Sequence, residues 1–162
     1  MACLIIGLDN DRRAYVVEEF YRKRTNPEVL GEWLKEKKKK YPFLDRIYCD
    51  PSDPLHRNTL NGMGLSVSVA NNKVMPGINF VFDMFAIAGD GLPRLFIHSS
   101  CSNLIDEVNI YRYADVKDGL VVKEEPVSVD NHSVDALRYG LFSHLGATGE
   151  FTVLDVGESK FF

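Results

Sequence analysis

The sequence predicts one α/β domain whose sheet contains both antiparallel and parallel strands. A length of 162 residues suits a single domain that can bury a sizeable core. Two β-type runs separated by a short polar cluster open the chain and predict an antiparallel hairpin. Strand and helix patterns then alternate through the middle of the sequence, which is typical of sheets with parallel pairs.

The first elements have clear boundaries in the sequence. Strands are expected over Cys3–Leu8 and Ala14–Tyr21, with the turn Asp9-Asn10-Asp11-Arg12 between them. A helix follows, with Asn26 as a candidate cap and Pro27 in its first turn. It ends in Lys35-Glu36-Lys37-Lys38-Lys39-Lys40, which places cations at the negative end of the helix dipole. This lysine run indicates a solvated helix end, with a contact to a phosphate backbone as the alternative.

The later elements alternate in type. The expected segments are a strand at 46–49, a short helix from 54 to about 61, a strand at 65–69, a helix at 76–88, a strand at 95–97, a helix at 102–110, an extended stretch at 120–123, and a last helix from about 131 to 145. Residues 149–162 are a weak strand or a loose tail.

Composition and motifs exclude several classes of protein. Hydrophobic residues make up 45% of the chain, which excludes a disordered or fibrous protein, and the formal charge of −4 argues against coating nucleic acid through net charge. No apolar run is long enough to cross a membrane, and the start lacks the features of a secretory signal. Three cysteines without metal-ligand spacing are expected to be reduced thiols in the cytosol. Phosphate-loop and dinucleotide-binding glycine motifs are absent.

Asp50 is the first candidate site residue. It follows the apolar strand Ile47-Tyr48-Cys49, at the carboxyl end of a strand, where open α/β sheets place their sites. The alternative is structural, because Asp50, Ser52 or Asp53 can each cap the helix that follows.

The second candidate is the segment that opens the last helix. His132 and Asp135 are three residues apart and share a helix face. The alternative is that Asp130 or Asn131 caps the helix while Asp135 pairs with Arg138. Two aspartates that converge at strand and helix ends suit Mg²⁺ or Mn²⁺, which prefer oxygen ligands. The other histidines are expected to be structural, and thiol catalysis by Cys101 is not favoured.

Several segments together resemble the C-terminal nuclease domain of bacteriophage terminase large subunits, over roughly residues 2 to 146. The segments that carry the resemblance are Tyr15-Val16-Val17-Glu18-Glu19-Phe20-Tyr21, Tyr48-Cys49-Asp50-Pro51-Ser52, Asn72-Lys73-Val74-Met75-Pro76-Gly77-Ile78, Leu95-Phe96-Ile97, Leu104-Ile105-Asp106-Glu107, Glu125-Pro126-Val127 and Asp130-Asn131-His132-Ser133-Val134-Asp135-Ala136-Leu137-Arg138-Tyr139.

The resemblance implies an RNase H-like mixed sheet flanked by helices, over residues 1–148, with 149–162 as a C-terminal tail. It implies a metal-dependent endonuclease that cuts concatemeric double-stranded viral DNA by a two-metal mechanism with Mg²⁺ or Mn²⁺. Asp50 and Asp135 would be catalytic metal ligands, with His132 beside them. The expected partners are DNA, the terminase ATPase domain, the small terminase subunit and the portal protein, in the cytoplasm of the host cell.

The chain departs from the family in one respect. In the family a strand with the first catalytic aspartate precedes the hairpin, whereas here the strand at 3–8 matches the next one. Loss of that central strand is expected to leave a gap between the hairpin and the Asp50 strand, with unpaired edges. Asp9 and Asp11, in the hairpin turn, are poor replacements, and one of Glu18 and Glu19 is a weaker candidate.

Two readings of function follow. The first is a terminase nuclease domain. The second is a non-catalytic remnant or fragment of a terminase that keeps only the fold and partner contacts, which the missing first aspartate supports. A cellular RNase H-like resolvase shares the metal chemistry, but no feature of the sequence favours it.

Overall fold

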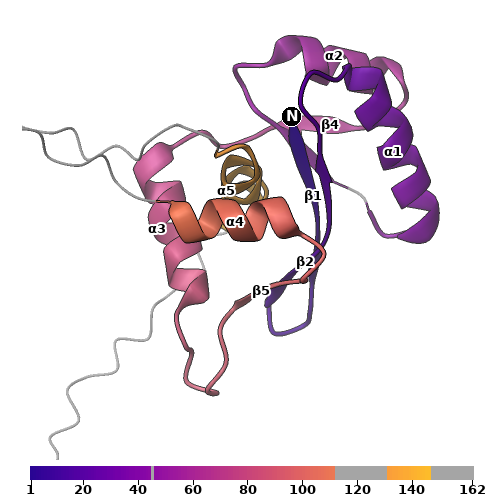
Figure 1. Cartoon of the computed structure of the whole chain (residues 1–162). Helices are drawn as coiled ribbons and strands as arrows, with labels where there is room; N and C mark the ends of the chain where they lie inside the picture. The colour runs from indigo at the N-terminus through magenta and orange to yellow at the C-terminus, as the bar shows by residue number, and fades with distance from the viewer. Residues whose placement is uncertain (45, 112–130, 147–162) are drawn as a thin grey trace, which may run out of the picture.

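The computed structural model describes residues 1–44, 46–111 and 131–146 as a mixed α/β fold (Figure 1). In chain order its elements are β1 (Ala2–Leu8), β2 (Ala14–Tyr21), α1 (Pro27–Lys40), β3 (Ile47–Cys49), α2 (Pro54–Gly62), β4 (Val67–Val69), α3 (Val74–Phe85), β5 (Leu95–Ile97), α4 (Ser102–Ile110) and α5 (His132–His144). The α/β class with antiparallel and parallel pairs is confirmed.

The first sheet has the order β1-β2-β5. β1 and β2 form the predicted antiparallel hairpin, with Ala2 opposite Tyr21 and Leu8 opposite Ala14. A register shift between Ile5 and Ile6 marks a bulge in this pair. β5 adds to the other edge of β2 in parallel orientation.

The second sheet contains β3 and β4, which pair in parallel. No strand of the described ranges joins it to the first sheet, so β1 and β3 both have one unpaired edge. This separation agrees with the gap expected between the hairpin and the Asp50 strand.

Helices cover the hairpin on both sides (Figure 1). α1 and α2 lie on one side, and α3, α4 and α5 lie on the other. The core is accordingly divided in two. Leu34, Leu60 and Ile47 pack under α1 and α2, whereas Leu104 and Leu137 belong to the cluster under α3, α4 and α5.

Most predicted boundaries agree with the structure, and one helix differs. α3 was expected over 76–88 but spans Val74–Phe85. It stops because Ala86 has an extended backbone, and Ile87, which continues the apolar pattern, instead forms an isolated bridge with Pro93. Asn26 precedes α1 as expected, but its side chain makes no capping hydrogen bond.

Two expected segments, the extended stretch at 120–123 and the strand or tail at 149–162, lie outside the described residues. Within the described ranges, no helix has the length and apolar character needed to cross a bilayer.

Candidate functional site

Asp50 lies directly after β3, at the predicted carboxyl end of the strand. Its Oδ1 accepts a hydrogen bond from the Ser52 backbone N–H at 2.8 Å, and its Oδ2 accepts one from the Tyr139 hydroxyl at 3.1 Å. The cap of α2 is Asp53, whose carboxylate accepts from the His56 N–H. Asp50 is therefore available for a role other than capping α2.

Asp135 occupies the first turn of α5. Its Oδ1 accepts a hydrogen bond from Arg138 at 2.9 Å, and the Arg138 side chain is only 5% exposed. This is the ion pair that the structural alternative expected, but it is largely buried on the arginine side. Arg138 also lies over the Tyr139 ring, 4.4 Å from its centroid.

Tyr139 connects the two aspartates. Asp135 and Tyr139 are four residues apart and so share a face of α5, while the Tyr139 hydroxyl reaches Asp50 from the other side. Burial raises the pKa of Tyr139, and the negative charges of Asp50 and Asp135 raise it further, against the opposing charge of Arg138. The phenol thus remains protonated and keeps donating to Asp50 at neutral pH. Asp50 and Asp135 lie on either side of it.

His132 is the first residue of α5 and is exposed. Its ring contacts Tyr21 of β2, with 6.3 Å between ring centroids. It makes no hydrogen bond to Asp50 or Asp135 within the described residues, so the expected neighbour relationship with Asp135 is one of helix face only.

Two glutamates hold the amino end of α5. Buried Glu107 of α4 accepts hydrogen bonds from the backbone N–H groups of Ser133 and Val134, at 2.6 and 3.0 Å. Glu19 of β2 accepts from the Ser133 hydroxyl and from the backbone N–H of Leu104. These carboxylates occupy positions where helices α4 and α5 leave backbone donors unsatisfied. They position the helix that carries Asp135.

Glu107 was not recognised as a supporting residue in the sequence. A glutamate in an amphipathic helix normally faces solvent, and only the packing of α4 against α5 reveals the buried position. Glu19 was a weak candidate for the metal cluster, and the structure places it instead on these helix termini. Glu18 points to the opposite side, where it pairs with Lys37 and Lys40 of α1.

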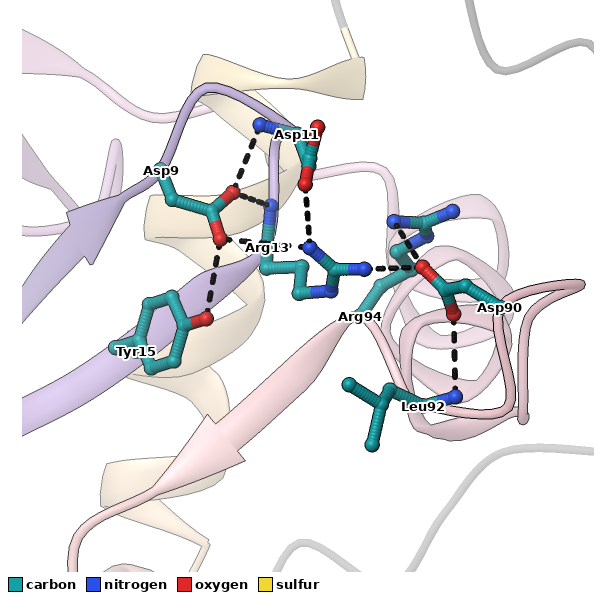
Figure 2. A network of polar contacts seen from close by, with 7 residues as sticks. All are labelled: Asp9, Asp11, Arg13, Tyr15, Asp90, Leu92 and Arg94. Carbon is teal, nitrogen blue, oxygen red and sulfur yellow. Dashed lines mark hydrogen bonds and ion pairs between the residues drawn. The ribbon is translucent and has the colours of Figure 1, made fainter.

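Asp9 and Asp11 are held in a network at the hairpin turn (Figure 2). Arg13 pairs with Asp9, Asp11 and Asp90, and the Asp9 carboxylate also accepts from the Tyr15 hydroxyl. The turn is at the end of the hairpin away from Tyr21, which contacts His132. Neither aspartate is therefore brought to the Asp50 and Asp135 site, as expected for turn residues.

The donor set partly fits a divalent cation. Carboxylate oxygens suit Mg²⁺ and Mn²⁺, and Asp50 and Asp135 supply two carboxylates from rigid elements. Within the part of the chain that the structure describes, no group of three His, Cys, Asp or Glu side chains is arranged to hold a metal ion. Two carboxylates fit a single cation that keeps several water ligands, and the two-metal arrangement needs further ligands.

The remaining candidates have structural contacts. His56 pairs with Asp53, His98 lies 2.7 Å from the Ser100 hydroxyl, and His144 lies 3.3 Å from the Tyr48 hydroxyl. The cysteines are free, and burial raises the pKa of the Cys101 thiol, which argues against a reactive thiolate. In the lysine run, Lys37 and Lys40 are engaged with Glu18.

Solved structures with the same arrangement of elements are terminases. The chain superposes on the nuclease domain of the g2p large terminase from bacteriophage SPP1, solved with bound Mn, with a TM-score of 0.66 and 21% identity. The match covers 86% of this chain and 76% of that domain. The chain has the fold of a terminase nuclease domain.

The large terminase of a thermophilic bacteriophage has the same fold. The match has a TM-score of 0.67 and 21% identity over 89% of this chain, and in the complex of that protein with ATP-γ-S these values are 0.69 and 22%. This chain spans 36% of the thermophilic phage terminase. No protein-family model and no curated protein matches the sequence. The RNase H-like terminase nuclease fold expected from the sequence is thus supported by structural similarity.

Proposed function

We propose that this chain is a metal-dependent endonuclease of the terminase type, which hydrolyses phosphodiester bonds of double-stranded DNA. The observation that carries the proposal is the position of Asp50 and Asp135 on either side of Tyr139 in a terminase nuclease fold. Mn bound to the SPP1 nuclease domain supports a role for a divalent cation, Mg²⁺ or Mn²⁺, here.

In this proposal the roles of the residues follow from their contacts. Asp50 and Asp135 hold the cation, which when bound activates water and stabilises the leaving oxygen. Arg138 and Tyr139 orient the two carboxylates through the hydrogen bonds that they donate. His132, exposed at the start of α5, faces the solution from which DNA approaches and contacts the substrate or its water.

The partners in this proposal are DNA and the other components of a packaging motor, namely the ATPase domain, the small terminase subunit and the portal protein. The setting is the cytoplasm of an infected or prophage-carrying host cell. A formal charge of −4 makes the chain a poor DNA binder by itself, so the partners deliver DNA to the site. Its cations then position the backbone without reading sequence.

A second candidate function is a non-catalytic remnant that keeps fold and partner contacts. The observation in its favour is that only two carboxylates converge at the site among the described residues, and that each already accepts a hydrogen bond from a neighbouring side chain.

Cleavage of supercoiled plasmid by the purified chain tests the proposal. We expect nicking with Mn²⁺, none with EDTA, and at least about a hundredfold loss in Asp50→Asn and Asp135→Asn. Asp83→Asn is the matched control, because Asp83 is exposed on α3 away from the site. A chain that is folded by circular dichroism but does not cut favours the remnant. Cutting that survives both variants refutes the site.

A further inference from the structure

An apolar slot separates the two sheets. A cavity of about 540 Å³ lies between β1 and β3 and is lined along the whole of β1 from Cys3 to Leu8. One wall comes from the end of α1 and the segment after it, including Phe43 and Leu44, and the other comes from Gly140 and Leu141 of α5. The slot is therefore bounded by two strand edges and by apolar groups on both faces.

Both boundaries of the slot lack a partner among the described residues. β1 pairs only with β2, and β3 pairs only with β4, so each presents unpaired backbone groups on its other edge. Phe43 is 94% exposed and Leu8 is 41% exposed at this slot. Large apolar side chains and open strand edges together indicate that an extended segment belongs between the two strands.

We propose that residues 151–156 of this chain occupy the slot as a β-strand that joins β1 to β3. Their sequence is Phe-Thr-Val-Leu-Asp-Val, rich in the aromatic and β-branched residues that favour strands, and glycines at 149 and 157 bound it. Its near-continuous apolar character fits a strand buried on both faces, which is what the slot offers.

The end of α5 brings this segment to the slot. Leu145, directly after the helix, lines the cavity, and four residues at 147–150 connect Gly146 to the segment. A connection of this length is ordinary between a helix and a strand in α/β folds. The segment is thus tethered within reach of the slot and has no long loop to close.

The direction of the strand follows from two contacts. Tyr139 reaches Asp50, and His144 reaches Tyr48, so α5 runs antiparallel to β3. The segment therefore enters at the amino end of β3 and runs parallel to it. In that direction residue 155 arrives at the carboxyl end, where Asp50 lies.

Asp155 is then a third carboxylate beside Asp50 and Asp135, and this step rests on the proposed function. Three carboxylates provide the oxygen ligands that the described residues alone do not. The proposal thus accounts for the incomplete site and for the open slot with one segment.

Hydrogen exchange on the full chain, without metal or DNA, tests the docking. We expect the slot-facing amides of β1 and β3 to exchange at least about tenfold more slowly than freely exposed amides. In Leu154→Asp this protection is lost, whereas the control Phe162→Asp, beyond Gly157, keeps it. A synthetic peptide of residues 149–158 added to Leu154→Asp restores protection, which separates loss of docking from loss of folding.

Two outcomes overturn the docking proposal. Unprotected β1 amides in the folded wild-type chain leave the slot for a segment of another polypeptide. Protection that appears only in a dimer, as measured by sedimentation, assigns the strand to a second copy of the chain.

Asp155→Asn separates the docking from the function. We expect it to retain the protection of β1 while its affinity for Mn²⁺, measured by electron paramagnetic resonance of the free ion, falls at least about tenfold. Unchanged Mn²⁺ affinity contradicts the role of Asp155. If β1 is protected but the wild-type chain neither binds Mn²⁺ nor cuts DNA, the docking stands and the proposed function fails.

Discussion

The Tyr139 hydroxyl donates a hydrogen bond to Asp50 Oδ2 at 3.1 Å, across 89 positions of sequence. This contact fixes the carboxyl end of β3 against the first turns of α5, where Asp135 lies. A strand end and a helix face are thereby held in one arrangement, as a cation site built from two elements requires.

Replacing Tyr139 tests how the phenol contributes. In Tyr139→Phe the hydrogen bond to Asp50 is lost, and we expect the free energy of unfolding to fall by about 1 kcal/mol in urea titrations. Cleavage stays within a few-fold of wild type, because Tyr139 orients a ligand and does not replace one. A loss as complete as that of Asp50→Asn contradicts this positioning role.

Glu107 supports α5 through two backbone hydrogen bonds. Glu107→Ala leaves two donors unsatisfied in a buried place, so we expect a loss of about 2–3 kcal/mol in the free energy of unfolding. Glu107→Gln keeps one acceptor oxygen and loses less. Asp106→Ala, at the exposed neighbouring position, is the control and is expected within about 0.5 kcal/mol of wild type. Equal effects in the two alanine variants would contradict the capping role.

Gly77 makes room for Arg138. A Cβ at this position would lie 2.9 Å from Arg138 Cγ and 3.0 Å from Cδ, so Gly77→Ala displaces the side chain that holds Asp135. We expect about 1–3 kcal/mol of destabilisation by thermal unfolding, together with reduced cleavage. Gly89→Ala meets no atom within 4 Å and serves as the control. Arg138 is tightly packed only if the two variants differ.

Glu18 gives the fold a dependence on acid. Burial opposes its ionisation, but hydrogen bonds from Lys37, Lys40 and Tyr41 outweigh burial and lower its pKa to about 2. A lowered pKa means that the stabilisation is complete above the unfolded value of about 4.3 and is lost as pH falls towards 2.

Comparing pH 7 with pH 2 measures this contribution. Glu18→Gln is expected to lower the free energy of unfolding by about 1 kcal/mol at pH 7 and to have little effect at pH 2. The control Glu32→Gln removes an exposed ion pair with Lys35 and is expected to change neither value appreciably. A Glu18→Gln effect of the same size at both pH values would contradict the ionic origin.

The hairpin and most helices were predictable because their signals are local. Alternating residues and a polar turn predicted Ala14–Tyr21, and its bounds are confirmed, as are those of Ser102–Ile110. α3 was placed two residues late and extended three residues too far because Ile87 continues the apolar pattern after the backbone has left the helix. Apolar character alone does not distinguish a helix end from a bridge.

The candidate site was only partly predictable. Sequence position identified Asp50 and Asp135, but not which aspartate caps α2, since Asp50 and Asp53 have the same local signal. The link through Tyr139 and the buried position of Glu107 depend on how separate helices pack, which periodicity does not specify. The roles of Asp50, Asp135 and His132 in catalysis, and the domain boundary at 148, stay predictions.

Anomalous scattering from crystals soaked in Mn²⁺ tests the central claim most directly. The account predicts a manganese peak contacted by carboxylate oxygens of both Asp50 and Asp135 in the wild-type chain, and no such peak in Asp135→Asn. A peak elsewhere, or none at concentrations that support cleavage, would contradict the assignment of these two aspartates as the metal site.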